Sequence, residues 1–586
     1  MGFIQPSPPT VDMEEWKELP HLARLKPLVQ DWGVNGFGTP YVVYLLYIVK
    51  LVVYSLGALL VISTTPGLGG LGNFGEWWTE PIVWQKLAVW TLLWEIIGLG
   101  CGSMPLTFRF SPMIGGILYW LRPGTVRLPP WPDKVPLTNG TSRTVFDVAL
   151  YVGVLVSGFF LLLGDGQEVA GLAAGRLDPA EIAVLLGLLG VLGLRDKVSF
   201  LGARVEVYGF LLVVFLFPID NLIVASQIVL FCIWWGAAGS KLNRHFPFVV
   251  SVMISNTPWN KSRTQKKKLW KDHPEDMRPS SVSAAAAHLG TVMEFTLPLL
   301  LLVTSGGFVA SLAVIGMIIF HIHITSTFPL AVPLEWNLFM IFGILFLFAE
   351  NGGVPFSTLD DPLLIALLLL IGVAVPVLGN FRPDLVSFLP SMRYYAGNWA
   401  TTQWLFRKDS EAEEKLDETI KKAAPVVVRQ LTEFYDDRDL AELMLASGLG
   451  FRSMHSHGRA LNGLIHRAVD DLSEYHVREG ELVSGVVNGW NFGDGHFHSE
   501  QLLEAVQERC GFEPGELRVV AIESQPAHVQ RQHYRILDAA TGLVEEGYVN
   551  VSDMVEQLPW LDGSAHPEFP VEVLGETPSE RVAATA

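Results

Sequence analysis

Long apolar runs are the feature that most constrains this chain. A membrane-spanning helix needs about 20 consecutive, mostly apolar residues, and such runs recur from residue 41 to residue 380. Only 17% of the 586 residues are charged, whereas soluble proteins average roughly 25%. The sequence therefore predicts a mainly α-helical, polytopic transmembrane bundle. The length criterion predicts about ten spans, at 41–62, 82–100, 144–164, 179–195, 199–217, 219–239, 283–303, 307–326, 334–349 and 362–380.

Basic residues between these spans predict the orientation of the chain. Most of them lie in segments 101–143, 195–204 and 240–282, with nine Lys or Arg from Lys241 to Arg278. With ten spans these loops share one side, and the positive-inside rule makes that side cytoplasmic. Both termini are then expected in the cytoplasm. The loop at 327–333 would share this side although it has no basic residue, which is the weakest point of the predicted topology.

Charge also separates the bundle from a tail. Residues 382–586 contain 18 Lys or Arg against 34 Asp or Glu, whereas residues 1–381 contain 23 against 25. Such an asymmetry predicts separate domains. The acidic balance argues against nucleic acid as a partner, because phosphate binding needs a basic face. Charged helices are predicted over 409–445, and alternating strands from Leu517 to Val551 with a turn at 538–542. The tail is therefore predicted to be a small mixed α/β domain.

The predicted organisation has four parts. An N-terminal arm occupies 1–40 and could lie at the membrane interface, and the helical membrane domain occupies 41–381. A soluble, cytoplasmic α/β domain follows at 382–570, and a disordered tail at 571–586. Within the membrane domain, the segment 101–135 contains an apolar run too short to span, so it is either a loop on the membrane surface, which we favour, or a re-entrant helix.

Several ionisable side chains fall at apparent membrane depth, where charge is costly unless it faces a cavity or a partner. His288, Thr291 and Glu294 follow one another at three-residue steps and form one polar edge of a helix. His321 lies on the next predicted helix, while His323 points to a different face. These groups are expected to surround a shared cavity, since a carboxylate in mid-helix has few other uses in lipid.

Lys241 allows two interpretations. A lysine removed from water loses proton affinity and becomes a general base near neutral pH, whereas a carboxylate nearby would oppose that change. The simpler interpretation is that Lys241 ends its helix and pairs with phosphate headgroups. From the residue pattern alone, the simpler interpretation is favoured.

A resemblance to a known family changes this balance. The runs Gly236-Ala-Ala-Gly-Ser-Lys241-Leu-Asn243, Gly290-Thr-Val-Met-Glu294-Phe-Thr-Leu-Pro298 and Gly316-Met-Ile-Ile-Phe-His321-Ile-His323 are similar to the HTTM membrane domain of vitamin K-dependent γ-carboxylases and their bacterial relatives. The similarity is clearest over 234–346. The family's tryptophan after the Lys-Leu-Asn element is replaced here by Phe246-Pro247-Phe248, and the tail does not resemble the carboxylase β-rich domain. By length and layout the chain also resembles an uncharacterised family of bacterial membrane proteins.

The resemblance implies a multi-pass protein of the bacterial plasma membrane that acts on a lipid or isoprenoid quinone. In the carboxylases the lysine deprotonates a reduced quinone, and that role would fall on Lys241. The leading hypothesis makes Lys241, Glu294 and His321 catalytic. It places a lipid or quinone, as the possible cofactor, beside His288, Thr291, His323 and Glu95. The alternatives are a lipid-binding or transport component of cell-envelope biogenesis without chemistry, and a scaffold whose tail recruits proteins that the sequence does not identify.

Two polar stretches have simpler interpretations. The basic loop 261–271 is expected to rest on anionic lipid headgroups, which we favour over the alternative of a regulatory docking site for the acidic tail. The stretch 489–498 contains His496 and His498, which could contribute to a metal site, but no second ligand cluster is fixed by its spacing. A glycine-rich surface turn with solvated histidines is therefore favoured there, and no metal site is assigned.

Overall fold

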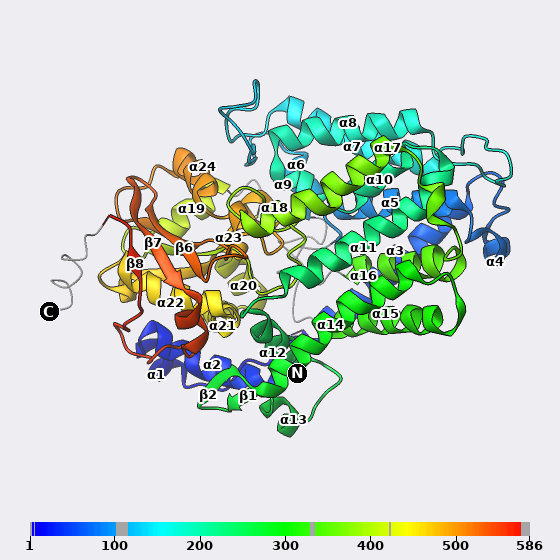
Figure 1. Ribbon diagram of the computed structural model, residues 1–586. Coiled ribbons are helices and arrows are strands. Elements are labelled where there is room, and N and C mark those ends of the chain that lie inside the picture. The colour runs from blue at the N-terminus through cyan, green and yellow to red at the C-terminus, as the bar shows by residue number, and fades with distance from the viewer. Residues whose placement is uncertain (1–2, 5, 101–114, 328–333, 421–423, 576–586) are drawn as a thin grey trace.

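A computed structural model describes residues 3–4, 6–100, 115–327, 334–420 and 424–575. Long helices lie side by side in one half of the molecule, and the strands and helices of the tail gather at one end of them (Figure 1). The expected helical membrane region and the expected C-terminal region with a β-sheet are both present. Cys101, Met113 and Ile114 of the apolar run at 113–121, residues 328–333 of the loop without basic residues, and residues 576–586 lie outside the described residues.

Six helices in the described ranges are long and apolar enough to cross a membrane. Their outward faces carry exposed Leu, Ile, Val and Phe, as lipid contact requires. Five are α3 (Tyr41–Ser63), α7 (Val145–Leu163), α11 (Leu222–Ser240), α14 (Ser281–Val303) and α15 (Gly307–Thr327). The sixth, Pro362–Phe381, is α17 (Pro362–Leu369), a π-helical turn (Leu370–Ala374) and α18 (Val375–Phe381).

The other four predicted spans form shorter helices, so a count of about ten is not confirmed. The segment 199–217 is divided into two helices at Arg204, whose φ of 54° is left-handed, a conformation that a non-glycine residue inside a helix does not adopt. These four spans correspond to α5 (Pro81–Ile96), α8 (Pro179–Arg195), the pair α9 (Lys197–Gly202) and α10 (Tyr208–Phe215), and α16 (Leu334–Gly343), which continues as a π-helix (Ile344–Glu350). Further short helices outside the predicted spans are α4 (Phe74–Trp77), α6 (Gly115–Trp120) and α12 (Phe246–Asn256).

The tail is built on a six-stranded antiparallel sheet of order β4-β3-β5-β6-β7-β8. The turn at 538–542 joins β6 to β7, as expected. The strands are β3 (Thr401–Arg407), β4 (Tyr475–Glu479), β5 (Leu517–Ile522), β6 (Arg531–Asp538), β7 (Gly542–Asn550) and β8 (Glu572–Val573). The helices are α19 (Ala412–Ile420), α20 (Val427–Tyr435), α21 (Arg438–Met454), α22 (Ser456–Ala468), α23 (Gly480–Asn488), α24 (Glu500–Cys510) and α25 (Val551–Glu556).

The N-terminal arm packs against the tail. It forms α1 (Met13–Glu18) and α2 (His21–Asn35), and Pro20 separates them, whereas Pro27 is accommodated inside α2. Leu22 and Leu25 join a core shared with Leu449 of α21. The residues whose spacing indicated an amphipathic helix therefore bury their apolar face in protein.

The basic connector of residues 257–280 also lies against the arm and the tail. It forms α13 (Arg263–Lys267) and a hairpin of β1 (Trp270–Asp272) and β2 (Asp276–Pro279). The indole of Trp270 donates to the Gly33 carbonyl at 3.0 Å, and Arg278 pairs with Glu556 of α25 at 3.0 Å. The basic connector, the arm and the tail thus occupy the same end of the bundle.

Candidate functional site

Lys241 and Glu294 form an ion pair inside the bundle, although 53 residues separate them. Their side chains are only 8% and 5% exposed. Lys241 follows the last residue of α11, and Glu294 lies in the middle of α14. The ammonium also lies 5.6 Å from the centre of the Phe246 ring, close enough for a cation–π contact. Lys241 therefore has an internal partner in place of a lipid phosphate.

Asn243 fixes the turn that positions Lys241. Its side-chain carbonyl accepts from the backbone N–H groups of His245 at 2.7 Å and Phe246 at 3.0 Å, so it caps the start of α12. Its amide donates to the carbonyls of Ser240 at 2.6 Å and Ala396 at 3.0 Å. The Lys-Leu-Asn element thus joins the end of α11 to the segment that leads into the tail.

His321 is held between two side chains at the same level of the bundle. Trp234 donates its indole N–H to His321 Nε2 at 3.1 Å, and His321 Nδ1 lies 2.8 Å from Asn337 Oδ1. Because an indole only donates and an amide oxygen only accepts, this arrangement places the imidazole proton on Nδ1. His321 also lies within electrostatic range of Lys241, so α11, α14, α15 and α16 together contribute one polar region.

A second buried polar region contains Glu95. Lys50 of α3 pairs with Glu335 of α16 at 3.1 Å and donates to the Gly100 carbonyl at 3.3 Å. The Tyr54 hydroxyl, 2.8 Å from Thr91 Oγ1, lies within electrostatic range of both Glu95 and Glu335. The helix α16 connects the two regions, since it carries both Glu335 and the Asn337 that holds His321.

The remaining predicted residues lie elsewhere. Thr291 is buried, and its hydroxyl donates to the Ala287 carbonyl of its own helix at 3.1 Å. His288 and His323 are exposed on the outer surface of the bundle. The polar edge predicted on α14 therefore turns Thr291 and Glu294 inward and His288 outward. Sequence reasoning missed Glu335 and Asn337, although Glu335 meets the same criterion that selected Glu294, a carboxylate inside a predicted span.

The stretch 489–498 is buried, so the predicted surface turn with solvated histidines is wrong. Trp490, Asp494 and His498 are each at most 1% exposed, because the stretch lies between the tail and the membrane helices. His496 Nδ1 lies 3.1 Å from Asp494, and its Nε2 lies 2.8 Å from Glu523. No group of three or more His, Cys, Asp or Glu residues that could hold a metal ion occurs in the described ranges.

The charges of this histidine and its two carboxylates reinforce one another. Burial lowers the pKa of His496, but Glu523 and Asp494 outweigh burial and raise that pKa to about 9. Burial raises the pKa of each carboxyl, but the contact with His496 prevails and holds the pKa values of Asp494 and Glu523 at about 2. The three groups are therefore all charged at neutral pH.

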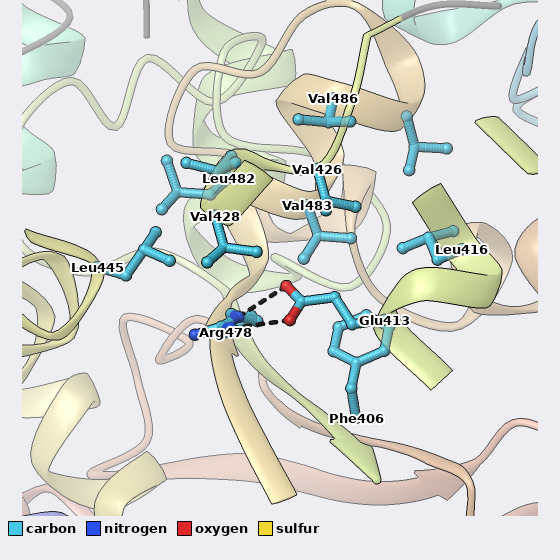
Figure 2. A pocket seen from close by; sticks show the side chains of 12 residues that line it. Phe406, Glu413, Leu416, Val426, Val428, Leu445, Arg478, Leu482, Val483 and Val486 are labelled. Atoms are coloured by element: carbon cyan, nitrogen blue, oxygen red, sulfur yellow. Dashed lines mark hydrogen bonds and ion pairs between the residues drawn. The ribbon is translucent and has the colours of Figure 1, made fainter. Parts of the chain in front are cut away.

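The tail also contains a small cavity of about 20 Å³, room for little more than one water molecule. Arg478 and Glu413 lie side by side at its edge among aliphatic side chains (Figure 2). Arg478 is paired bidentately with Glu413 at 2.7 and 2.8 Å and also contacts Glu442 at 2.8 Å. With its polar groups paired and its volume so small, this cavity does not suit a lipid or a quinone.

The chain belongs to a family of transmembrane proteins of unknown function, DUF3556, whose model matches residues 1–574. The match covers both the bundle and the tail. No curated protein and no solved structure matches the chain. The resemblance to HTTM domains therefore remains a sequence-based prediction.

Proposed function

We propose that this member of the DUF3556 family binds an amphiphile with a long apolar chain and a hydrogen-bonding head, either a membrane lipid or an isoprenoid quinone. The head would lie beside Lys241, Glu294 and His321, and the chain would extend among the apolar helices. This proposal rests on one observation, the ion pair of Lys241 with Glu294 inside a membrane bundle.

The energetics of that pair support a functional role. Withdrawing two charges from water costs several kcal/mol per ion, and replacing a buried pair by apolar residues is often neutral or stabilising. A bundle that needed only stability would have no requirement for Lys241 and Glu294. Ionisable groups inside membrane proteins usually mark a pathway or a binding site for this reason.

The surrounding contacts favour binding over base chemistry. A lysine paired with a carboxylate holds its proton, and an ammonium donates hydrogen bonds but accepts none. Lys241 would act as a base only after its proton had passed to Glu294. In the catalytic version of the proposal Lys241 and Glu294 share one proton and His321 presents a fixed Nδ1–H tautomer. In the binding version the same three groups orient a polar head.

Glu95, Thr291, His288 and His323 contribute differently. Glu95 would extend the polar region toward Lys50 and Glu335, and Thr291 lies one helical turn from Glu294. The outward histidines, His288 and His323, would contact surrounding lipid or a neighbouring protein. The exposed lysines of the 261–271 loop would bind anionic headgroups at the membrane surface.

Mass spectrometry of lipids and quinones extracted from the purified protein tests the proposal. The unaltered protein should retain one amphiphile above the bulk membrane composition. In the binding version, Lys241→Met and Glu294→Gln should each raise the Kd for this amphiphile about tenfold, the effect of losing about 1.4 kcal/mol of binding free energy. Lys134→Met changes an exposed lysine of another loop and should have no effect.

The two versions of the proposal give different results. In the binding version Lys241→Met loses the amphiphile. In the catalytic version Lys241→Met keeps it, but a reduced quinone is no longer converted. A protein that carries only bulk lipid, unchanged by both substitutions, would contradict the proposal.

A further inference from the structure

A separate polar cluster lies where the tail meets the membrane helices. Its members are Lys197, Arg393, Asp494, His496 and Glu523, which we call the junction cluster. Lys197 begins α9, Arg393 lies between α18 and β3, and Glu523 directly follows β5. Asp494 and His496 lie in the buried stretch before α24. The cluster therefore draws on both halves of the molecule.

Contacts inside the junction cluster leave one member apart. His496 binds both carboxylates, and Lys197 Nζ donates to the His496 backbone carbonyl at 3.3 Å. Arg393 lies within electrostatic range of Glu523 and Asp494. In the described part of the chain, however, no ion pair joins Arg393 to either carboxylate. The buried guanidinium of Arg393 therefore lies beyond ion-pair distance of the two carboxylates that influence it electrostatically.

Arg393 and Asp494 also have unused hydrogen-bonding atoms. Arg393 is 0% exposed, and its Nε and Nη1 atoms have no hydrogen-bond partner among the described residues. Its Nη2 makes one long hydrogen bond, 3.3 Å, to the Val386 carbonyl. Asp494 is 1% exposed, and no donor in the described ranges reaches its Oδ2. Leaving a buried charged group unsatisfied costs about 1–3 kcal/mol or more, so these atoms indicate a missing partner.

The charge balance indicates the chemistry of that partner. The cluster contains three cationic side chains and two carboxylates, and the carboxylates and His496 stay charged at neutral pH. Burial lowers the pKa of Lys197, while Asp494 and Asp196 oppose this. An anion would compensate the excess positive charge. An unpartnered N–H group of the Arg393 guanidinium can donate to an oxygen of an oxyanion, and the free Asp494 oxygen needs a donor, which a P–OH group supplies.

We propose that the junction cluster binds a phosphate group, with Arg393 donating to one of its oxygens and Asp494 accepting from its hydroxyl. The phosphate would be either inorganic phosphate or a phosphomonoester on a lipid head, since both carry the same oxygens and hydroxyl. The phosphate would contact the segment between α18 and β3 at Arg393, the 489–498 stretch and α9. A bound phosphate would therefore fasten the tail to the bundle.

Thermal unfolding of the full-length protein in detergent, with and without inorganic phosphate at constant ionic strength, tests this proposal. Phosphate should raise the unfolding temperature of delipidated protein, by an amount that grows with the logarithm of the phosphate concentration above the Kd. Arg393→Gln should raise the apparent Kd for phosphate about 10- to 100-fold, the cost of a lost charged hydrogen bond. Arg382→Gln removes an exposed arginine eleven residues away, 54% exposed and paired with Asp384, and should leave the Kd unchanged.

Two further measurements test the proposal if Arg393→Gln does not fold or if the phosphate belongs to a lipid. If Arg393→Gln does not fold, Lys197→Gln should still weaken phosphate binding by several-fold, because it removes one positive charge. If delipidated protein binds no inorganic phosphate but the native protein retains a lipid with a phosphomonoester head that Lys197→Gln loses, the phosphate belongs to a lipid. Absence of both phosphate and phospholipid binding, or an experimental density map with only water between Arg393 and Asp494, would overturn the proposal.

Discussion

At the residue scale, two buried lysines of the bundle are matched with carboxylates far away in sequence. Lys241 meets Glu294, and Lys50 meets Glu335, each across different helices. Such pairs repay the cost of leaving water only when the geometry is good and the remaining donors are satisfied. Lys50 contacts a carboxylate and a backbone carbonyl. Fixed partners therefore account for lysines at a depth where an isolated charge would not persist.

His496 gives a pH-dependent prediction at the same scale. Its folded-state pKa of about 9 lies above the ordinary 6.5. The folded protein therefore holds more protons than the unfolded chain between pH 6.5 and 9. This contribution, on the order of 3 kcal/mol, is complete below pH 6.5 and disappears as the pH rises through 9. Denaturant unfolding of His496→Gln should show a weaker loss of stability across this window than the unaltered protein.

The control for this measurement is His528→Gln, which changes an exposed histidine of the same domain and should leave the pH dependence unchanged. If the free energy of unfolding changes equally with pH in the unaltered protein and in His496→Gln, Asp494 and Glu523 do not hold the imidazole charged. The two carboxylates themselves stabilise the folded state above about pH 4, and their contribution disappears as the pH falls through about 2.

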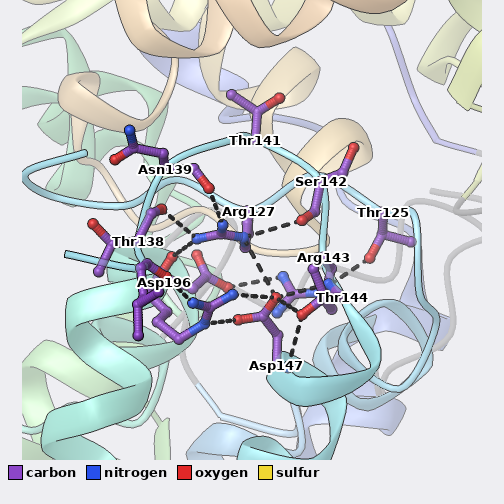
Figure 3. Close-up of polar contacts among 12 residues, drawn as sticks. Thr125, Arg127, Thr138, Asn139, Thr141, Ser142, Arg143, Thr144, Asp147 and Asp196 are labelled. Carbon is purple, nitrogen blue, oxygen red and sulfur yellow. Dashed lines mark hydrogen bonds and ion pairs between the residues drawn. The ribbon is translucent and has the colours of Figure 1, made fainter. Parts of the chain in front are cut away.

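At the element scale, one arginine organises the loop between α6 and α7. Arg127 is 2% exposed and donates to the backbone carbonyls of Ser142, Thr138, Asn139 and Arg195 at 2.6–3.0 Å. Asp147, Arg143, Arg195 and Asp196 form ion pairs around it (Figure 3). The network ties the loop to the beginning of α7 and the end of α8.

Arg127→Lys should release this loop. A guanidinium has five N–H donors in a fixed plane, whereas an ammonium has three and cannot reach four separate carbonyls. We expect faster hydrogen exchange and proteolysis across residues 128–142, with an overall destabilisation of about 1–3 kcal/mol. Lys134→Met, on an exposed residue of the same loop, is the control. Unchanged exchange rates in Arg127→Lys would show that the remaining ion pairs hold the loop without it.

At the scale of the whole molecule, the bundle and the tail share one hydrophobic core. One cluster of buried residues extends from Ala58 in α3 to Leu537 in β6, and the N-terminal arm and the basic connector pack on the tail (Figure 1). Segments that pack together lie on the same side of a membrane. The basic connector, by the positive-inside rule, would place this side in the cytoplasm.

Single cysteines in a background without Cys101, Cys232 and Cys510 test this arrangement. Cysteine at Lys267 and at Ser564 should react with an impermeant thiol reagent in inverted membrane vesicles and not in intact cells. Cysteine at Glu168, in the acidic loop between α7 and α8, should react only in intact cells. Labelling of Lys267→Cys and Ser564→Cys from opposite sides would be incompatible with the packing of the connector on the tail.

The sequence predicted membrane helices and strands more accurately than it predicted polar neighbours. The apolar run at 41–62 follows from a local requirement, since polar side chains are costly in lipid. The alternation at 517–551 follows from another, since successive residues of a strand face opposite sides of a sheet. The count of about ten spans depended on apolar length alone, which does not distinguish a lipid-facing helix from α5, a 16-residue helix buried among its neighbours. The strands β3 and β4 escaped prediction because their partners are distant in the chain.

By itself, the sequence determined that the chain enters a membrane, that an acidic tail with a sheet follows, and that Lys241, Glu294 and His321 are costly residues at bilayer depth. Only the tertiary structure decided that Lys241 pairs with Glu294, that Asn337 fixes His321, and that the 489–498 stretch is buried beside Arg393. The physical reason is that transfer into lipid is a property of each segment, whereas neutralising a buried charge depends on which distant segment packs beside it.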